Sequence, residues 1–391
     1  TARTGDASNG FVLSAPMTEI ADMAHQPLLQ VSAESRASAP QVLNLIRQSP
    51  LNAMLSGVLQ EAQGTGPLQT RFKLNVPLLT PESTQVQGSV QFNGSDLRIT
   101  SATPWLEKIQ GTLQFHEGGF GVNKLQAQML GGPVQIEGGL RATGSHAGAA
   151  AASGTVAASG AEPAVLFHAQ GRVSATALRA AREFFPIDGL AQHAGGSTAY
   201  SARLGWQQGQ PDLSLQSTLE GLSLQLPAPL GKTANSAMPL SIRIQPQGDP
   251  PGLQDQIQVT LGDVARVHYV RDVSGATPRV LRGSLSLGVA GDKLPTLSET
   301  GVTANVVMDR LSLDEWRDLV PALASSTSPG HPAAAWSAYL PTRIGLKANT
   351  LTAEDRTLHQ VVAGGLREGN TWRVNVDARE LNGHVVYRQP S

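Results

Sequence analysis

The chain of 391 residues contains no cysteine, so disulfide frameworks, iron–sulfur clusters and thiolate zinc sites are excluded. Charged residues make up only 15% of it, and its 29 basic and 30 acidic side chains leave a net charge of −1. These charges are scattered along the chain instead of forming blocks. We therefore expect no nucleic-acid partner and no electrostatic attraction to an anionic bilayer.

Long hydrophobic runs are also lacking. A helix needs about 18 consecutive apolar residues to cross a bilayer, and the longest runs here are only a few residues. No signal peptide opens the chain, which begins at Thr1 without an initiator methionine. We therefore expect an interior or processed piece of a longer protein, with any anchor in a part that this chain does not include.

Helical patterns are few and short. The clearest covers residues 49–64, where Pro50 stands at the first helical position and apolar residues recur at i, i+3, i+4 and i+7. A second is expected over residues 176–185. A third follows Ser312, which can form an S-x-x-E capping box with Glu315. Their polar faces lack the lysine and arginine of membrane-surface helices, so we expect them to cap the ends of a sheet.

Most of the remaining chain alternates apolar and polar residues, and its 41 glycines favour many short strands. A period of two places every second side chain on the same face of a strand. Antiparallel sheets built from such strands have one apolar and one wet face. The alternating segments are residues 112–115, 133–137, 221–227, 242–244, 257–261, 285–289 and 372–376.

Between these strands stand residues that tolerate the positive φ of tight hairpin turns, so we expect consecutive strands to be antiparallel neighbours. Glu354-Asp355-Arg356 is interpreted as a solvated hairpin tip. The other predicted turns are Asn93-Gly94, Glu117-Gly118-Gly119, Gly131-Gly132, Gly138-Gly139 and Glu368-Gly369-Asn370.

These patterns divide the chain into segments. Residues 1–39 stay unassigned, residues 40–141 carry a helix and β-hairpin repeats, and residues 165–391 form a second β-rich groove segment with short helices. Residues 142–164 are nearly all Ala, Gly, Ser and Thr and bury too little apolar surface to offset the cost of ordering a backbone, which predicts a mobile loop. A turn-rich stretch at residues 322–335 predicts another surface loop.

The sequence motifs that would indicate a catalytic, metal or cofactor site are not found. The nine histidines show neither H-x-H nor H-x-x-x-H spacing, and no nucleotide-binding loop or G-x-S-x-G elbow is present. Asp314, Glu315 and Asp318 could supply an acid and a base, but their place near the amino end of a helix favours capping. The five tryptophans could form a sugar platform, although their wide spacing favours core anchoring. We expect no enzyme, no metal and no cofactor.

Residues 64–141 carry the motifs VQGSVQFNG, IQGTLQFHEGGFG and MLGGPVQIEGG. This segment resembles the serial pattern Q-G-x-V-x-F, then G-x-L-x-F-x-E-x-G, then LGG of YhdP-type proteins in the AsmA-like superfamily. Residues 219–229, 307–319 and 346–387 look like the same family. The resemblance covers most of the chain from about residue 40 onward.

The resemblance implies a mainly β fold, a long antiparallel, curved and groove-like sheet of successive hairpins with a few short capping helices. It also implies a protein of the periplasm, anchored to the inner membrane in its full length. Its expected partners are phospholipid and, through parts absent from this chain, components of the inner and outer membranes. The chain would bind phospholipid acyl chains and let them move passively between the two membranes of a Gram-negative envelope.

In such a groove the apolar strand faces would bury lipid tails while headgroups stay wet. The hypothetical lining residues are Leu113, Phe115, Val134, Ile136, Leu222, Leu224, Leu226, Ile242, Ile244, Val259, Leu285, Leu287, Val374 and Val376. Two other interpretations stay open. The same face could pack against a second layer, which would make the chain a structural β-rich envelope scaffold without lipid conduction. A carbohydrate-active β protein would need a carboxylate pair that the sequence does not evidently offer.

Overall fold

The computed structural model describes residues 2–4, 11–21, 27–48, 59–80, 83–100, 103–116, 119–141, 165–181, 187–207, 210–247, 253–275, 278–289, 291, 295–317, 319 and 338–388. The chain forms two compact units. Unit 1 comprises Thr1–Arg172 and Arg203–Gln210, and unit 2 comprises Val173–Ala202 and Pro211–Ser391.

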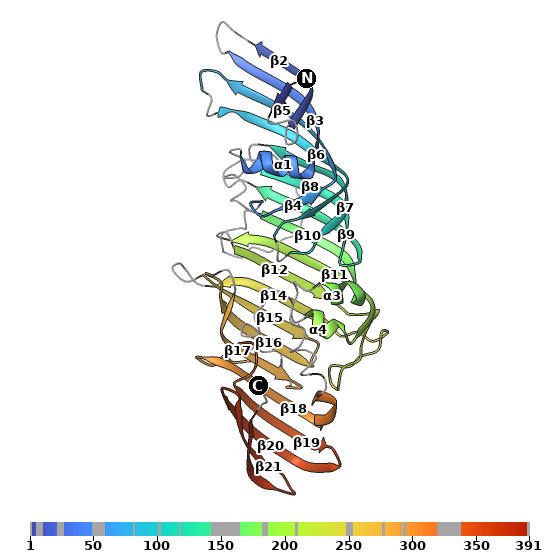
Figure 1. The fold of residues 1–391 in the computed structure, drawn as a ribbon, viewed down its shortest axis with the longest axis vertical. Coiled ribbons are helices and arrows are strands. Elements are labelled where there is room, and N and C mark those ends of the chain that lie inside the picture. The colour runs from blue at the N-terminus through green and yellow to red at the C-terminus, as the bar shows by residue number, and fades with distance from the viewer. Residues whose placement is uncertain are drawn as a thin grey trace. The chain divides into compact units, whose positions relative to one another are not determined.

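Unit 1 is an antiparallel sheet whose strands follow one another in the order β1-β2-β3-β5-β6-β7-β8-β9-β10, with β4 beside β6 (Figure 1). Its strands are β1 (Ala2–Thr4), β2 (Phe11–Ala21), β3 (Leu28–Ser38), β4 (Gln63–Thr65), β5 (Pro67–Pro77), β6 (Gln85–Arg98), β7 (Leu106–His116), β8 (Gly119–Met129), β9 (Gly132–Arg141) and β10 (Val165–Ser174).

Unit 2 pairs β12 with β14 and then every strand from β14 to β22 with the next, while the short β13 pairs with the start of β11. Its strands are β11 (Ala194–Gln207), which runs past the unit boundary, β12 (Gln210–Ser217), β13 (Leu222–Leu224), β14 (Leu240–Gln247), β15 (Gln254–Leu261), β16 (Ala265–Asp272), β17 (Arg279–Leu287), β18 (Gly301–Ser312), β19 (Arg343–Ala353), β20 (Arg356–Glu368), β21 (Thr371–Asp377) and β22 (Asn382–Arg388).

The predicted fold class is confirmed: the chain is mainly β, and its curved, open sheet is mostly antiparallel with a few short helices. The expectation that consecutive strands are antiparallel neighbours is wrong for β17–β18 and β18–β19, which are parallel pairs, and for β4, which pairs with β6 instead of β5. A parallel pair needs a crossover long enough to return to the starting edge. Residues 288–300 and 313–342 provide these two crossovers.

The helices are α1 (Ala39–Arg47), α3 (Ala175–Ala180) and α4 (Ile187–Ala191), and residues 313–317 are also helical. The helix predicted over residues 176–185 is confirmed in its described part by α3, and the helix after Ser312 is confirmed by residues 313–317. Of the helix predicted over residues 49–64, residues 49–58 lie outside the described residues; the prediction is wrong for the rest, because residues 59–61 form a turn and a bend and residues 63–64 belong to β4. The loops predicted at residues 142–164 and 322–335 also lie outside the described residues.

Helix α1 was not predicted, although its amino end carries a signal. The backbone N–H of Ser38 donates a 2.9 Å hydrogen bond to Gln41 Oε1, and Pro40 stands in the first turn. Ser38 and Gln41 therefore form an S-x-x-Q pattern of the capping-box type. The apolar repeat that follows Gln41 is short. The longer apolar repeat after Pro50 therefore led to a helix being predicted there instead.

The predicted turns have mixed outcomes. Residues 130–131 and 369–370 turn between paired strands, as expected, and Glu354 and Asp355 turn between β19 and β20. The turns predicted at Asn93-Gly94 and Gly138-Gly139 are wrong, because both dipeptides lie inside strands. Gly94, with φ of 90°, sits where the β6–β7 register shifts, and a Cβ at Gly138 would collide with the carbonyl oxygen of Leu166. These glycines permit a bulge and a close backbone approach.

Within the part of the chain that the structure describes, three strands contain a non-glycine residue with positive φ: Lys108 in β7, Lys124 in β8 and Gln360 in β20. At each, two apolar residues are three positions apart instead of two, as in Leu106 and Ile109. Adding one residue to a strand keeps the next apolar side chain on the same face and bends the strand locally. The period of two is thereby interrupted without a change of face.

Aromatic rings pack over glycines of the neighbouring strand. The ring of Phe115 covers Gly88, and the ring of Tyr269 covers Gly283, so that a Cβ on either glycine would collide with it. Tyr269 is held in place because its hydroxyl donates a 2.8 Å hydrogen bond to the carbonyl oxygen of Tyr339. Contacts of this kind stabilise strand interiors that glycine alone would weaken.

We expect Gly283→Ala to lower the free energy of unfolding by about 1–3 kcal/mol, because the added methyl group must displace the anchored Tyr269 ring. Gly364→Ala is the matched control, since a Cβ there meets nothing within 4 Å. That control should be neutral or stabilising by up to ~1 kcal/mol. Urea unfolding followed by tryptophan fluorescence checks both variants, and equal midpoints would contradict the close packing.

Candidate functional site

The predicted residues of unit 1 lie on one face of the sheet. Residues directly paired across antiparallel strands share a face. Leu113 stands between Val90 and Val122, and Ile136 stands between Leu125 and Ala169. Phe115 (between Gly88 and Phe120) and Val134 (between Ala127 and Gly171) continue the same face.

In unit 2 the predicted residues belong to three adjacent rows, each running across the strands on the same face. The central row is Leu215, Ile242, Val259, Val267, Leu285, Ala304, Ile344, Gly365, Val374 and Val385. The leucine row is Leu240, Leu261, Ala265, Leu287, Val306, Leu346, Ala363 and Val376. Ile244 lies in the third row, on the other side of the central row. The candidate site is thus an extended apolar face and not a localised pocket.

The opposite face of the sheet is polar. In unit 1, Gln126, Gln135 and Gln170 pair in one row. In unit 2, Arg243, Gln258 and His268 form a similar row. Burial and the nearby Arg282 lower the pKa of His268, which keeps this face from gaining a further charge at neutral pH.

Leu222, Leu224 and Leu226 do not belong to the rows of the apolar face. Leu222 is 5% exposed and packs in a cluster with Ala175, Ala194 and Leu219, against which Leu224 also packs. Leu226 follows the end of β13. The structure therefore brings eleven of the fourteen predicted residues onto apolar strand faces, places Leu222 and Leu224 in a packed cluster, and leaves Leu226 outside both.

The apolar face is largely half-buried. Of the fourteen residues, only Val134 (3% exposed) and Leu222 (5%) are buried, and the other twelve have intermediate exposure. If a second layer sealed this face, its side chains would be as fully buried as Ile109, which has no exposed surface. Side chains such as Leu285 and Val374 therefore keep surface that an apolar guest could cover.

Three clusters of buried residues seal parts of the apolar face near the helices. In unit 1, α1 contributes Ala39 and Val42, which pack on Leu68. In unit 2, the cluster around Leu222 adjoins Leu240 and Leu261 of the leucine row. A further cluster joins Leu311, Ala348, Leu351 and Val361 with the partly buried Trp316.

A polar group bounds the apolar face of unit 2 next to the row of Ile244. Arg271 forms a bidentate ion pair with Asp255, with nitrogen–oxygen distances of 2.9 and 2.5 Å, and its Nη1 donates to the hydroxyl of Tyr339 at 3.3 Å. Burial lowers the pKa of Arg271, but the bonds to Asp255 and Tyr339 outweigh it and hold the pKa above its ordinary value. Both partners are largely buried, with side-chain exposures of 17% for Arg271 and 11% for Asp255.

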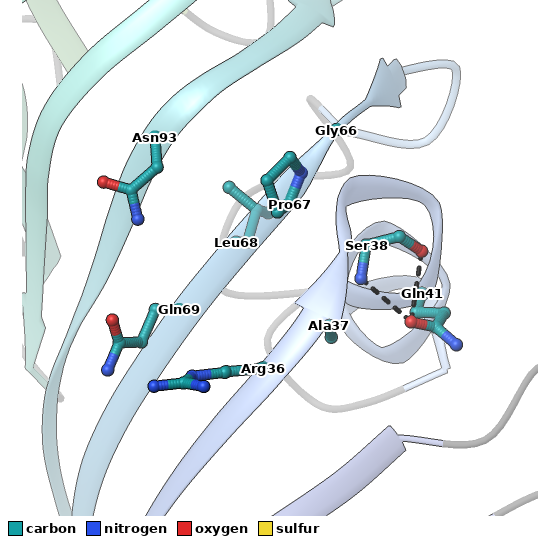
Figure 2. Close-up of a pocket in the computed structure, with 9 residues that line it drawn as sticks. All are labelled: Arg36, Ala37, Ser38, Gln41, Gly66, Pro67, Leu68, Gln69 and Asn93. Carbon is teal, nitrogen blue, oxygen red and sulfur yellow. Dashed lines mark hydrogen bonds between the residues drawn. The ribbon is translucent and has the colours of Figure 1, made fainter.

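Two pockets are lined by polar and apolar residues together. The pocket in Figure 2 has a volume of about 440 Å³, and Arg36, Gln69 and Asn93 line it side by side from β3, β5 and β6. Ser38 and Gln41 border it with the hydrogen bonds that begin α1. A second pocket of about 510 Å³ includes Asn375 and His384. Arg36 is the one charged side chain among the nine residues that line the first pocket, so it offers no acid–base pair.

Of the carboxylates considered for catalysis, Asp314 is engaged in local structure. Asp314 accepts a 2.7 Å hydrogen bond from the backbone N–H of Glu354 and pairs with Arg317 at 3.1 Å, while Asp318 lies outside the described residues. Within the described ranges, no group of three or more His, Asp or Glu side chains could hold a metal ion. The described part of the chain also contains no helix with the length and apolar character needed to span a membrane.

Comparison with protein families matches the model described as YhdP protein over residues 9–391. The chain belongs to the YhdP family. The AsmA-like superfamily indicated by the sequence motifs is consistent with this match. No curated protein and no solved structure matches the chain. Membership of the YhdP family indicates a lipid-transport-related envelope protein of a non-enzymatic family.

We expect Asp255→Asn to destabilise unit 2 by about 3 kcal/mol, because it leaves the buried Arg271 guanidinium without a counter-charge. Glu34→Gln is the control, since the Glu34–Arg71 pair is more than half exposed and should contribute at most ~1 kcal/mol. Urea unfolding at neutral pH measures both. Equal effects would show that Asp255 and Arg271 are solvated in solution.

Proposed function

We propose that this chain is a periplasmic groove segment that binds phospholipid acyl chains and lets them move passively between the inner and outer membranes of a Gram-negative envelope. The observation that supports this most is the apolar face of unit 2, whose central row takes one residue from each of β12 and β14–β22. Anchoring to the inner membrane, and contacts with components of both membranes, belong in this proposal to other parts of the full-length protein.

The need for such a face follows from the cost of exposing lipid tails to water. Each methylene transferred from an apolar environment into water costs about 0.8 kcal/mol, so two tails with about thirty methylenes together cost ~24 kcal/mol. Free diffusion of a phospholipid across an aqueous compartment is therefore negligible. A half-buried apolar face lowers this cost by covering the tails while it leaves the headgroup in water.

Passive movement is expected because the side chains along a row are chemically similar from one strand to the next. Val259, Val267 and Leu285 are aliphatic side chains of similar size on successive strands, which lie about 4.8 Å apart. A tail that shifts from one strand to the next exchanges one aliphatic contact for another, so the free energy of neighbouring positions is nearly equal. No nucleophile, metal or nucleotide is needed for this step.

The alternative is a structural β-rich envelope scaffold without lipid conduction. The three buried clusters favour it, because there the protein's own side chains fill the apolar face. A scaffold would carry no lipid after purification, whereas a conduit would. Organic extraction and native mass spectrometry of the chain produced in a Gram-negative host separate the two, and absence of phospholipid would leave the scaffold as the better account.

A photocrosslinking amino acid placed at Leu113 should capture phospholipid, because Leu113 is a half-buried member of the apolar face. The same amino acid at the neighbouring Gln114, which is exposed on the opposite face of β7, is the matched control and should capture little. Mass spectrometry of the crosslinked adducts identifies the lipid. Equal capture at both positions would contradict binding on the apolar face.

We expect Val374→Glu to reduce phospholipid recovered per mole of protein by at least fivefold, because a carboxylate in the central row must be desolvated when a tail covers it. Asn375→Glu introduces the same charge on the opposite face of β21, where Asn375 is exposed, and should leave the recovery unchanged. Circular dichroism confirms that both variants keep their strands. Recovery that falls equally in both would argue against the central row as the binding surface.

A further inference from the structure

Three side chains of the pocket in Figure 2 point to the polar face of unit 1. Arg36 of β3 pairs directly with Gln69 of β5, and Asn93 of β6 lies beside them. Leu68 and Phe92, which precede Gln69 and Asn93 in the sequence, pair with each other and pack in the apolar cluster with α1. Because side chains alternate between the faces of a strand, the three polar side chains lie on the face opposite that cluster.

The register of β3 and β5 leaves Arg36 without a counter-charge. Two residues earlier in β3, Glu34 stands opposite Arg71, and the two side chains form an ion pair at 2.9 Å. Arg36 instead stands opposite Gln69, which is uncharged. The guanidinium of Arg36 therefore faces an amide at the position where Arg71 faces a carboxylate.

The carboxylates of the same strands are engaged elsewhere. Strands β3, β5 and β6 contain two acidic residues, Glu34 and Asp96. Glu34 is held by Arg71. Asp96 accepts a 2.8 Å hydrogen bond from the backbone N–H of Lys108 and a 3.0 Å hydrogen bond from the hydroxyl of Thr65. Neither acid therefore neutralises the pocket.

The polar side chains of the pocket differ in how far their groups are already used. In the described part of the chain, the side chains of Arg36, Gln69 and Asn93 form no hydrogen bond or ion pair, whereas Ser38 and Gln41 at the edge bond to each other. A guanidinium donates paired hydrogen bonds to the oxygens of a carboxylate or phosphate. An amide both donates and accepts, which suits a hydroxyl group. Arg36 and Asn93 are exposed, so a solute can reach them.

We infer that this pocket binds a small, soluble, hydroxylated acid, with Arg36 at its phosphate or carboxylate and with Gln69 and Asn93 at neighbouring hydroxyl groups. The pocket volume of about 440 Å³ suits such a molecule, since small-molecule sites in proteins occupy about 300–1,000 Å³. Phosphate and carboxylate share the oxyanion that a guanidinium recognises, so sugar phosphates and sugar acids belong to one ligand class here. The site lies on the face opposite the apolar rows and does not rest on the proposed function.

Equilibrium dialysis of the full chain against radiolabelled glucose 6-phosphate, glucuronate, glucose and inorganic phosphate tests the ligand class. At least one of the two sugar acids should bind roughly tenfold more tightly than glucose, because hydrogen bonds between charged groups are about twice as strong as neutral ones. Inorganic phosphate should bind more weakly than the better sugar acid, because it brings no hydroxyl groups to the amides. Equal affinity for glucose and the acids, equal affinity for inorganic phosphate, or no binding of either acid overturns the inference.

A lipid headgroup could supply the same phosphate, so the source is tested by competition. Dihexanoyl phosphatidylglycerol, added at the same concentration as the bound sugar acid, should not displace it. Displacement would assign the pocket to a lipid headgroup and overturn its assignment to a soluble ligand.

Two variants test the residues. Arg36→Gln should weaken binding of the sugar acid roughly tenfold and leave the affinity for glucose unchanged, since it removes only the charged contact. Asn93→Asp should cause a similar loss although Arg36 is still present, because the new carboxylate supplies the missing counter-charge. Circular dichroism confirms that both variants keep their strands.

Lys73→Gln is the matched control. Lys73 is exposed on the same face of β5, four residues from Gln69, and its replacement removes the same charge. It should leave the affinity for the sugar acid unchanged. Equal losses in Arg36→Gln and Lys73→Gln would show attraction to net charge alone, and no loss in Arg36→Gln would remove Arg36 from the site; either result overturns the inference.

Discussion

The pairing register of the strands is the constraint on which the rest of the structure depends. Side chains alternate between the two faces of a strand, so a slip of one residue would move a whole set of leucines and valines to the polar face. Across unit 2 the register holds from Leu215 to Val385 without such a slip. Where the sequence departs from a period of two, residues such as Lys108 and Lys124 take a left-handed conformation and preserve the face.

Much of the fold was predictable because alternation is a local property. It identified the strands that carry Leu113, Ile242 and Val374, and hence the face on which they lie. The parallel pairs of β18 could not be predicted, since the pattern of a strand does not state the direction of its neighbour. The sequence also could not show whether a glycine marks a turn or a bulge inside a strand, because both need a positive φ. Gly94 was predicted in a turn and lies at a bulge.

The sequence predicted that the candidate site is one apolar face of the sheet. It did not predict which residues lie side by side on that face. Leu222 and Leu224 show the same alternation as Ile242 and Ile244, yet they pack in a cluster because β13 pairs with the start of β11 and lies outside the rows. The central row joins Leu215 to Val385, which are far apart in sequence and belong to one row only through the register of the intervening strands. Such long-range registration carries no signature in a single chain segment.

The two parallel pairs of β18 also affect the order in which unit 2 can form. Hairpins such as β15–β16 join residues that are close in sequence and form within microseconds, whereas the two pairings of β18 each join strands separated by a longer stretch of chain. The conformational entropy lost when two strands are brought together grows with the length of the chain between them. This cost arises before any contact between the strands compensates for it. From sequence separation we therefore expect the two pairings of β18 to form after the neighbouring hairpins.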